Sequence, residues 1–317
     1  MLMLGQIFHV ISRDGHGIRV GWTGHMAGTC RMFYLRGPAF DQSRFAQAIL
    51  HQVRQVAVME GFLKRKQTFF AKPLWLAAAG PADSSAVKLT NIALRIVNML
   101  AKSDVLCRRE DACQEKTVVR MLDQMSKLEI SLNSWLLEFY RGPSEHAAPY
   151  RRIAMSQNPG SESHLGVLAN VFGHVLEFPT VLSATTHAYV WICQLLLRQA
   201  IKDIAQLHPY PLLRARNQHE ILARSVDECA IDLCQSIPYI YTSCIGRSSS
   251  TIMACSGSLY FASLWWQHRS HEREASWCQR VKDILQSDVE AGGAYKTTFN
   301  WQVPIFSWWM LPDIFES

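Results

Sequence analysis

The sequence is poor in charged residues. Asp, Glu, Lys and Arg make up 18% of the 317 residues, whereas 49% of the residues are hydrophobic. Globular domains usually carry about a quarter charged residues, so this balance predicts extensive burial and argues against disorder. The net charge of +6 is mild and no long Lys/Arg block occurs, so the sequence offers no electrostatic footprint of a DNA-binding surface. The short run Lys64-Arg65-Lys66 could belong to a nuclear import signal, but a solvated helix end is the simpler interpretation.

The cysteines do not follow a metal-binding pattern. There are nine, scattered along the chain, and no C-x2-C pair occurs. A zinc cluster needs closely repeated thiolates in short loops, so that several converge on the metal ions. We therefore expect reduced, mostly buried cysteines, and neither a metal nor another cofactor.

Long hydrophobic runs are also missing. The N-terminus has neither the positive start nor the small-residue cleavage site of a secretory signal. The most apolar window, Val181 to Leu197, is interrupted by Thr, His and Gln residues, and fits a buried helix better than a membrane span. The sequence thus predicts a soluble intracellular protein with no membrane partner.

No sequence motif for catalysis is recognisable. The chain contains no phosphate-binding G-x4-G-K-[ST] or G-x-G-x2-G loop and no G-x-S-x-G elbow. His268, His271 and Glu272 resemble metal ligands, but their order is not that of the H-E-x2-H motif, and a solvated helix surface is the preferred interpretation. We expect a protein that is not an enzyme.

Helical periodicity is what the sequence does contain. Apolar residues recur every three to four positions over most of the chain, whereas alternation typical of strands is short wherever it occurs. We therefore expect an all-α fold, a layered helical array formed by one domain over residues 1–317. Residues 141–163 are the predicted internal loop, and the aromatic-rich tail at 299–317 either packs onto the helical body or docks a partner chain. The expected helices cover roughly residues 45–61, 89–100, 118–139, 165–176, 188–207, 222–238, 259–266 and 277–285. Gly61 is the expected C-cap of the first of these helices.

The stretch from Trp22 to Pro38 combines a packing motif with a sharp stop. Trp22, His25 and Gly28 follow one another at intervals of three, which places them along one side of a helix. Gly28 would leave room for another backbone, and His25 is more simply a hydrogen-bonded core residue than a ligand. The segment Arg36-Gly37-Pro38 then predicts the end of the helix, because Pro disfavours helical geometry before it.

This W-x2-H-x2-G helix followed by R-G-P resembles the regulatory domain of fungal zinc-cluster transcription factors, the six-cysteine binuclear class. Later blocks are similar in the same order: an aliphatic helix containing Trp191, a helix ending at Pro238, an aliphatic–Trp helix with Trp265, and a helix led by Trp277. The Trp265-Trp266 pair departs from the family, because the Pro that often follows the Trp is missing. In the family, the zinc cluster precedes this domain. The resemblance therefore implies that this chain begins inside the regulatory domain.

The resemblance implies a transcription-regulator-like protein without its own DNA-binding module. Its partners would be other transcription regulators, contacted through protein–protein interactions, and a small-molecule effector is a further implied ligand. The implied location is the nucleus, with the cytoplasm as the alternative, and the implied targets are secondary-metabolite or nutrient-use genes. Two alternatives stay open: an all-α enzyme or carrier of a biosynthetic pathway with no recognisable motif, and a truncated fragment of a DNA-binding activator.

Overall fold

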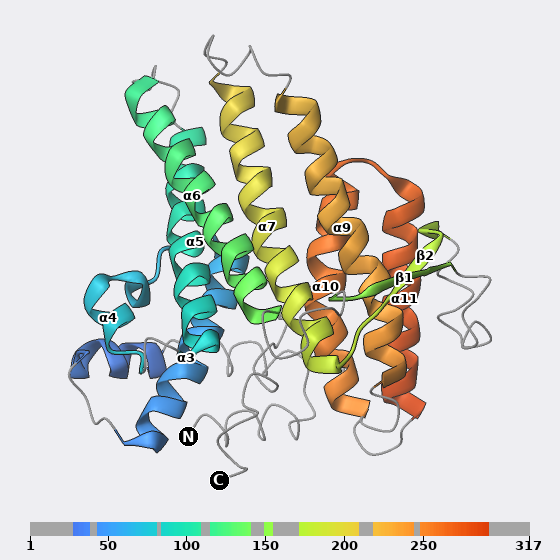
Figure 1. The fold of residues 1–317 in the computed structure, drawn as a ribbon, viewed down its shortest axis with the longest axis horizontal. Coiled ribbons are helices and arrows are strands. Elements are labelled where there is room, and N and C mark those ends of the chain that lie inside the picture. The colour runs from blue at the N-terminus through green and yellow to red at the C-terminus, as the bar shows by residue number, and fades with distance from the viewer. Residues whose placement is uncertain are drawn as a thin grey trace. The chain divides into compact units, whose positions relative to one another are not determined.

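The computed structural model describes residues 28–38, 43–80, 84–108, 115–140, 149–154, 171–208, 218–243 and 248–291. Most of these residues are helical, as the periodicity predicts (Figure 1). Among the described helices, none combines the length and the hydropathy that crossing a bilayer requires. The predicted tail at 299–317 lies outside the described residues.

The chain divides into two compact units, which are described separately here. Unit 1 comprises Met1–Val56, Tyr150–Thr185 and Cys234–Ser317, and unit 2 comprises Ala57–Pro149 and Thr186–Leu233. The expected single domain over 1–317 stays a prediction. The division falls inside three long helices, namely α3 (Arg44–Lys64), α7 (Val181–Leu207) and α9 (Gln218–Ser243).

Unit 2 is built around α5 (Ser85–Cys107) and α6 (Glu115–Tyr140), which pack side by side (Figure 1). Each helix turns one apolar stripe inward, because its hydrophobic residues recur with the helical period. Trp135 of α6 donates a hydrogen bond from its indole Nε1 to the carbonyl oxygen of Ser85, at 2.8 Å, and so links α6 to the start of α5. The most deeply buried side chains of the two stripes are Leu89, Ala93, Leu94, Ile96, Val97, Leu100, Val118, Met125 and Leu132.

The segment between α3 and α5 is held against α5 by polar contacts. It contains the short helices η1 (Phe69–Ala71) and α4 (Pro73–Ala77). Arg65 donates two hydrogen bonds to the carboxylate of Asp104, at 2.9 and 2.6 Å. Asn98 accepts a hydrogen bond from the backbone N–H of Thr68 at 2.7 Å and donates one to the Thr68 carbonyl at 3.2 Å. These contacts fix the position of η1 beside the middle of α5.

Unit 1 contains α10 (Ser248–His268), α11 (Glu272–Ala291) and two short strands. The strands β1 (Arg151–Ala154) and β2 (His174–Glu177) pair antiparallel, with Arg151 opposite Glu177. This hairpin corrects the all-α expectation in detail, because β1 lies inside the predicted loop at 141–163 and β2 overlaps the end of the predicted helix at 165–176. Gly173 has a φ of +72°, which breaks the helical pattern just before β2.

Two helices continue past a residue that was expected to end them. Gly61 was expected as a C-cap, but α3 continues to Lys64 and Gly61 is packed inside it. Pro238 was expected to close a helix, but α9 continues through it to Ser243. Proline removes one backbone hydrogen-bond donor but does not prevent helical turns on either side of it. Packing of the buried residues around Pro238 can therefore keep α9 helical at this position.

Candidate functional site

The structure describes the second part of the Trp22–Pro38 motif, from Gly28 onward, as a helix at residues 28–36. Trp22 and His25 lie outside the described residues. The predicted stop is confirmed: Arg36 is the last helical residue, and Gly37 has a φ of +75° and donates its N–H to the carbonyl of Phe33 at 3.0 Å. Pro38 follows directly. Within the described part of the chain, a Cβ built on Gly28 would meet no atom within 4 Å, so the expected close backbone contact is not seen there.

The other residues of the family resemblance are core residues. Trp191 is buried in unit 2, with its ring 5.2 Å from that of His187. Trp265 and Trp277 are buried in unit 1, as is Pro238 within α9. The ring of Trp277 meets Phe172 edge to face at 5.0 Å. These contacts stabilise the helical packing and present no reactive group.

The histidines near the end of α10 are engaged by aromatic rings. His268 lies beside Trp265 at 6.0 Å, and His271 stacks on Trp266 at 5.5 Å. His271 also places its Nδ1 3.8 Å from a carboxylate oxygen of Glu274. In the described ranges, no three His, Cys, Asp or Glu side chains are arranged to hold a metal ion.

A polar network inside unit 2 joins α6, α7 and α9. Arg198 of α7 donates from Nε to Glu129 at 2.6 Å, and from Nη1 to the Ser225 carbonyl and to the Cys229 sulfur, both at 3.1 Å. Burial raises the pKa of the Cys229 thiol to about 12, although the nearby Arg198 guanidinium acts in the opposite direction. The thiol is therefore protonated at neutral pH, which makes it a packing group and not a nucleophile.

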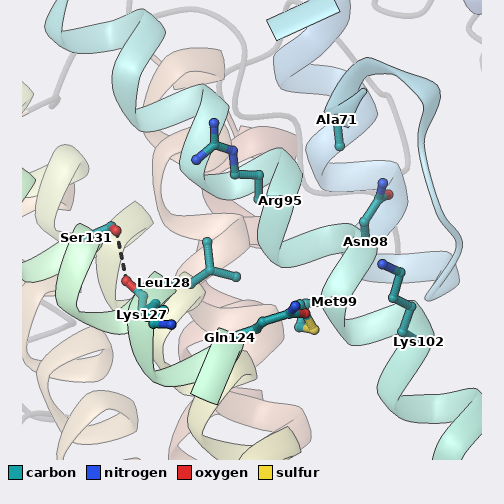
Figure 2. Close-up of a pocket in the computed structure, with 9 residues that line it drawn as sticks. All are labelled: Ala71, Arg95, Asn98, Met99, Lys102, Gln124, Lys127, Leu128 and Ser131. Carbon is teal, nitrogen blue, oxygen red and sulfur yellow. Dashed lines mark hydrogen bonds between the residues drawn. The ribbon is translucent and has the colours of Figure 1, made fainter. Parts of the chain in front are cut away.

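A groove over α5 is a candidate binding surface among the described residues of unit 2. One hollow, of about 340 Å³, lies between η1, α5 and α6 (Figure 2). A second hollow, of about 550 Å³, continues along α5 towards α4 and shares Ala71 and Arg95 with the first. We call the two together the basic groove. Its lining residues are Ala71, Pro73, Leu76, Ala77, Asn91, Arg95, Asn98, Met99, Lys102, Gln124, Lys127, Leu128 and Ser131.

The charge in the basic groove is positive. Arg95 and Lys102 are exposed and lie seven residues apart on α5, and neither has an ion-pair partner among the described residues. Figure 2 shows both on the α5 side, with Lys127 on the α6 side. Lys127 forms an exposed ion pair with Asp123 at 2.7 Å, a contact worth only a few tenths of a kcal/mol, roughly 0.2–0.5. The charges of Arg95 and Lys102 are therefore not neutralised by any residue that the structure describes.

The floor of the basic groove is apolar. Met99 and Leu128 are only 8% and 9% exposed, and they reach the groove from α5 and α6. On the α4 side the lining consists largely of Pro73, Leu76 and Ala77. The site therefore combines an apolar strip with positive charges at its edge, an arrangement suited to an amphipathic ligand carrying negative charge.

Sequence reasoning missed this groove. The signal in the sequence was the repeat of basic residues on the polar face of α5, where Arg95 and Lys102 are two turns apart. That spacing shows that the two cations share a face, but not that η1 and α6 border it. No family model, curated protein or solved structure matches the chain, so its functional interpretation depends on the groove and on the resemblance of its motifs.

Proposed function

We propose that this chain is transcription-regulator-like and acts through protein–protein contacts, with the basic groove as its docking surface and without sequence-specific DNA contacts by these 317 residues. The observation that carries this proposal is the pair of cations Arg95 and Lys102, which form no ion pair with the described residues, beside a floor formed by Met99 and Leu128. Protein interfaces typically combine an apolar centre with a polar, charged rim.

The resemblance to the regulatory domain of fungal zinc-cluster factors supplies the biological context. In its favour, the Arg36-Gly37-Pro38 stop ends a helix, and Trp191, Trp265 and Trp277 are buried in helices, as structural motif residues should be. The proposed partners are other transcription regulators, and the proposed location is the nucleus. Both hollows also lie within the range of about 300–1,000 Å³ that small-molecule sites occupy, so an effector could share the groove.

A tethering experiment tests the function. The full chain is fused to an unrelated sequence-specific DNA-binding domain, and transcription from a reporter carrying that domain's site is measured. We expect the tethered chain to change reporter output, and the double variant Arg95→Glu, Lys102→Glu to abolish the change. The control is Lys116→Glu, Arg280→Glu, which alters charge equally at two exposed residues outside the groove.

Protein level and thermal unfolding of each fusion are compared, so that misfolding is separated from loss of contact. A tethered chain that leaves the reporter unchanged at equal protein level would contradict the proposed function. An effect that survives charge reversal in the groove would contradict the assignment of the groove as the docking surface.

A further inference from the structure

Resting on the proposed function, we propose a specific occupant for the basic groove: an acidic amphipathic helix of a partner protein. Its carboxylates, two turns apart, would pair with Arg95 and Lys102, and its apolar side chains would cover Met99 and Leu128.

The spacing of the cations favours a helical partner. Seven residues of α-helix rise about 10 Å, so Arg95 and Lys102 lie about two turns apart along α5. A helix lying alongside α5 with carboxylates at positions i and i+7 presents negative charges at the same interval. Neither cation has an ion pair to break in the described part of the chain, so the new pairs would form without loss of existing ones.

The groove floor favours apolar side chains between those carboxylates. Met99 and Leu128 lie at the first hollow, and Leu76 lines the second. A partner helix with leucine-like residues at i+3 and i+4 would place them on the same face as its two carboxylates. The flexible methionine side chain adapts to partners of different shape, which suits a surface that binds an exchangeable partner.

The length of the groove sets the size of the occupant. Its α5 residues extend from Asn91 to Lys102, which corresponds to about 16 Å of helix. A contact of roughly three turns is small compared with stable protein interfaces, so we expect a Kd of roughly 10–100 µM. Such an interaction would be exchangeable and sensitive to salt.

Nucleic acid fits the same surface less well. None of the residues lining the two hollows is aromatic, so the groove offers no aromatic platform on which successive bases could stack. A phosphodiester backbone would also leave the apolar floor uncovered. Charge complementarity and the apolar strip are satisfied together only by a ligand that has both negative charge and hydrophobic side chains.

Peptide binding tests the inference directly. A fluorescent peptide of about 16 residues, long enough to form helix, carries Glu at i and i+7 and Leu at i+3 and i+4. Its binding to the full chain is followed by fluorescence anisotropy at about 50 and 200 mM salt. The control peptides are a scrambled sequence and a version with both Glu residues replaced by Gln.

We expect the designed peptide to bind in the stated range, and the two controls to bind about tenfold more weakly or not at all. The variant Arg95→Ala, Lys102→Ala should weaken the peptide about tenfold, whereas Lys116→Ala, Arg280→Ala should leave it unchanged. Both pairs are exposed, so circular dichroism should report the same fold for each. A second variant, Arg95→Glu, Lys102→Glu, should abolish binding.

Equal binding of the designed and scrambled peptides would overturn the inference, as would no binding at millimolar protein. Tighter, groove-dependent binding of a DNA or RNA oligonucleotide, or of a small dicarboxylate, would overturn it in favour of that ligand. The tethered reporter separates this failure from failure of the proposed function. A groove-dependent reporter effect without peptide binding would support the docking function and contradict only the acidic helix as the occupant of the groove.

Discussion

At the residue scale, Gly61 is the position where side-chain size matters most clearly. A Cβ built there would lie 2.3 Å from Cγ1 and 3.0 Å from Cγ2 of Val97, so the absence of a side chain allows α3 and α5 to approach each other within unit 2. The sequence suggested a close-approach glycine at Gly28 and a cap at Gly61. Periodicity could not show which glycine meets another helix, because that depends on the partner helix.

Gly61→Ala should therefore destabilise the protein by about 1–3 kcal/mol, because the added methyl group overpacks against Val97. In an open helix the same change would stabilise by roughly 1 kcal/mol. Urea denaturation measures the sign, and the double variant Gly61→Ala, Val97→Ala should cost less than the sum of the two single changes. Additive effects would show that the two side chains do not meet.

His51 is a buried titratable residue with a predictable pH effect. Gln55 donates a hydrogen bond from Nε2 to the His51 Nε2 at 2.9 Å, which requires the neutral ring to act as acceptor. Burial, assisted by the charge of Arg54, lowers the pKa of His51 to about 4. The unfolded chain therefore binds a proton first, near pH 6.5, and the folded state loses stability as pH falls from there towards 4.

The loss attributable to His51 should approach about 3 kcal/mol at pH 4, from a lowering of the pKa by two to three units. His51→Gln removes the titration while retaining a polar side chain. Denaturation of both proteins between pH 7 and pH 4 should show the difference in free energy of unfolding shifting in favour of the variant as pH falls. Parallel pH profiles would contradict the assignment.

At the element scale, long helices with clear apolar stripes were predictable and the short elements were not. The 118–139 pattern corresponds to α6, where Val118, Met125 and Leu132 are buried as expected. The apolar window from Val181 to Leu197 forms the first part of α7, as expected for a buried helix. The hairpin was missed because strands of four residues have too little alternation to be distinguished from a helix.

The contact between Arg198 and Glu129 couples α6 to α7, and Arg198 also reaches α9 through Ser225 and Cys229. Both side chains of the ion pair are largely buried, with 16% and 22% exposed. Arg198→Met and Glu129→Gln should each lower the free energy of unfolding by about 2 kcal/mol, because each leaves a partly buried charge without its partner. The double variant should cost less than the sum, as a thermodynamic cycle would measure. Additive effects of the two substitutions would indicate that water solvates each charge after its partner is removed.

At the scale of the whole molecule, the helical class could be predicted from the sequence, whereas the candidate site could not. Low charge and helical periodicity together indicate buried helices, and these are properties of each segment alone. The basic groove depends on Arg95 and Lys102 being bordered by η1 on one side and α6 on the other. That arrangement is set by contacts such as the one between Thr68 and Asn98, which no local pattern encodes.

The proposal that these 317 residues act through protein contacts predicts that they contact DNA only weakly. The purified chain should bind promoter duplexes only non-specifically, at roughly micromolar Kd or weaker at physiological salt, because no long basic block provides phosphate contacts. Electrophoretic mobility shift with specific and scrambled duplexes measures this. A sequence-specific complex in the nanomolar range would contradict the proposal.

The alternation of the two units along the chain limits how the protein can be divided into fragments for experiments. Unit 1 is formed by three separate segments and unit 2 by two, and the changeovers fall within α3, α7 and α9. No single cut can release either unit as a continuous piece, and a deletion that reaches into the helices between residues 44 and 291 removes part of a packed helix set. Truncation libraries and two-hybrid baits made from fragments would therefore present broken cores, and point substitutions in the intact chain are the sound way to map its contacts.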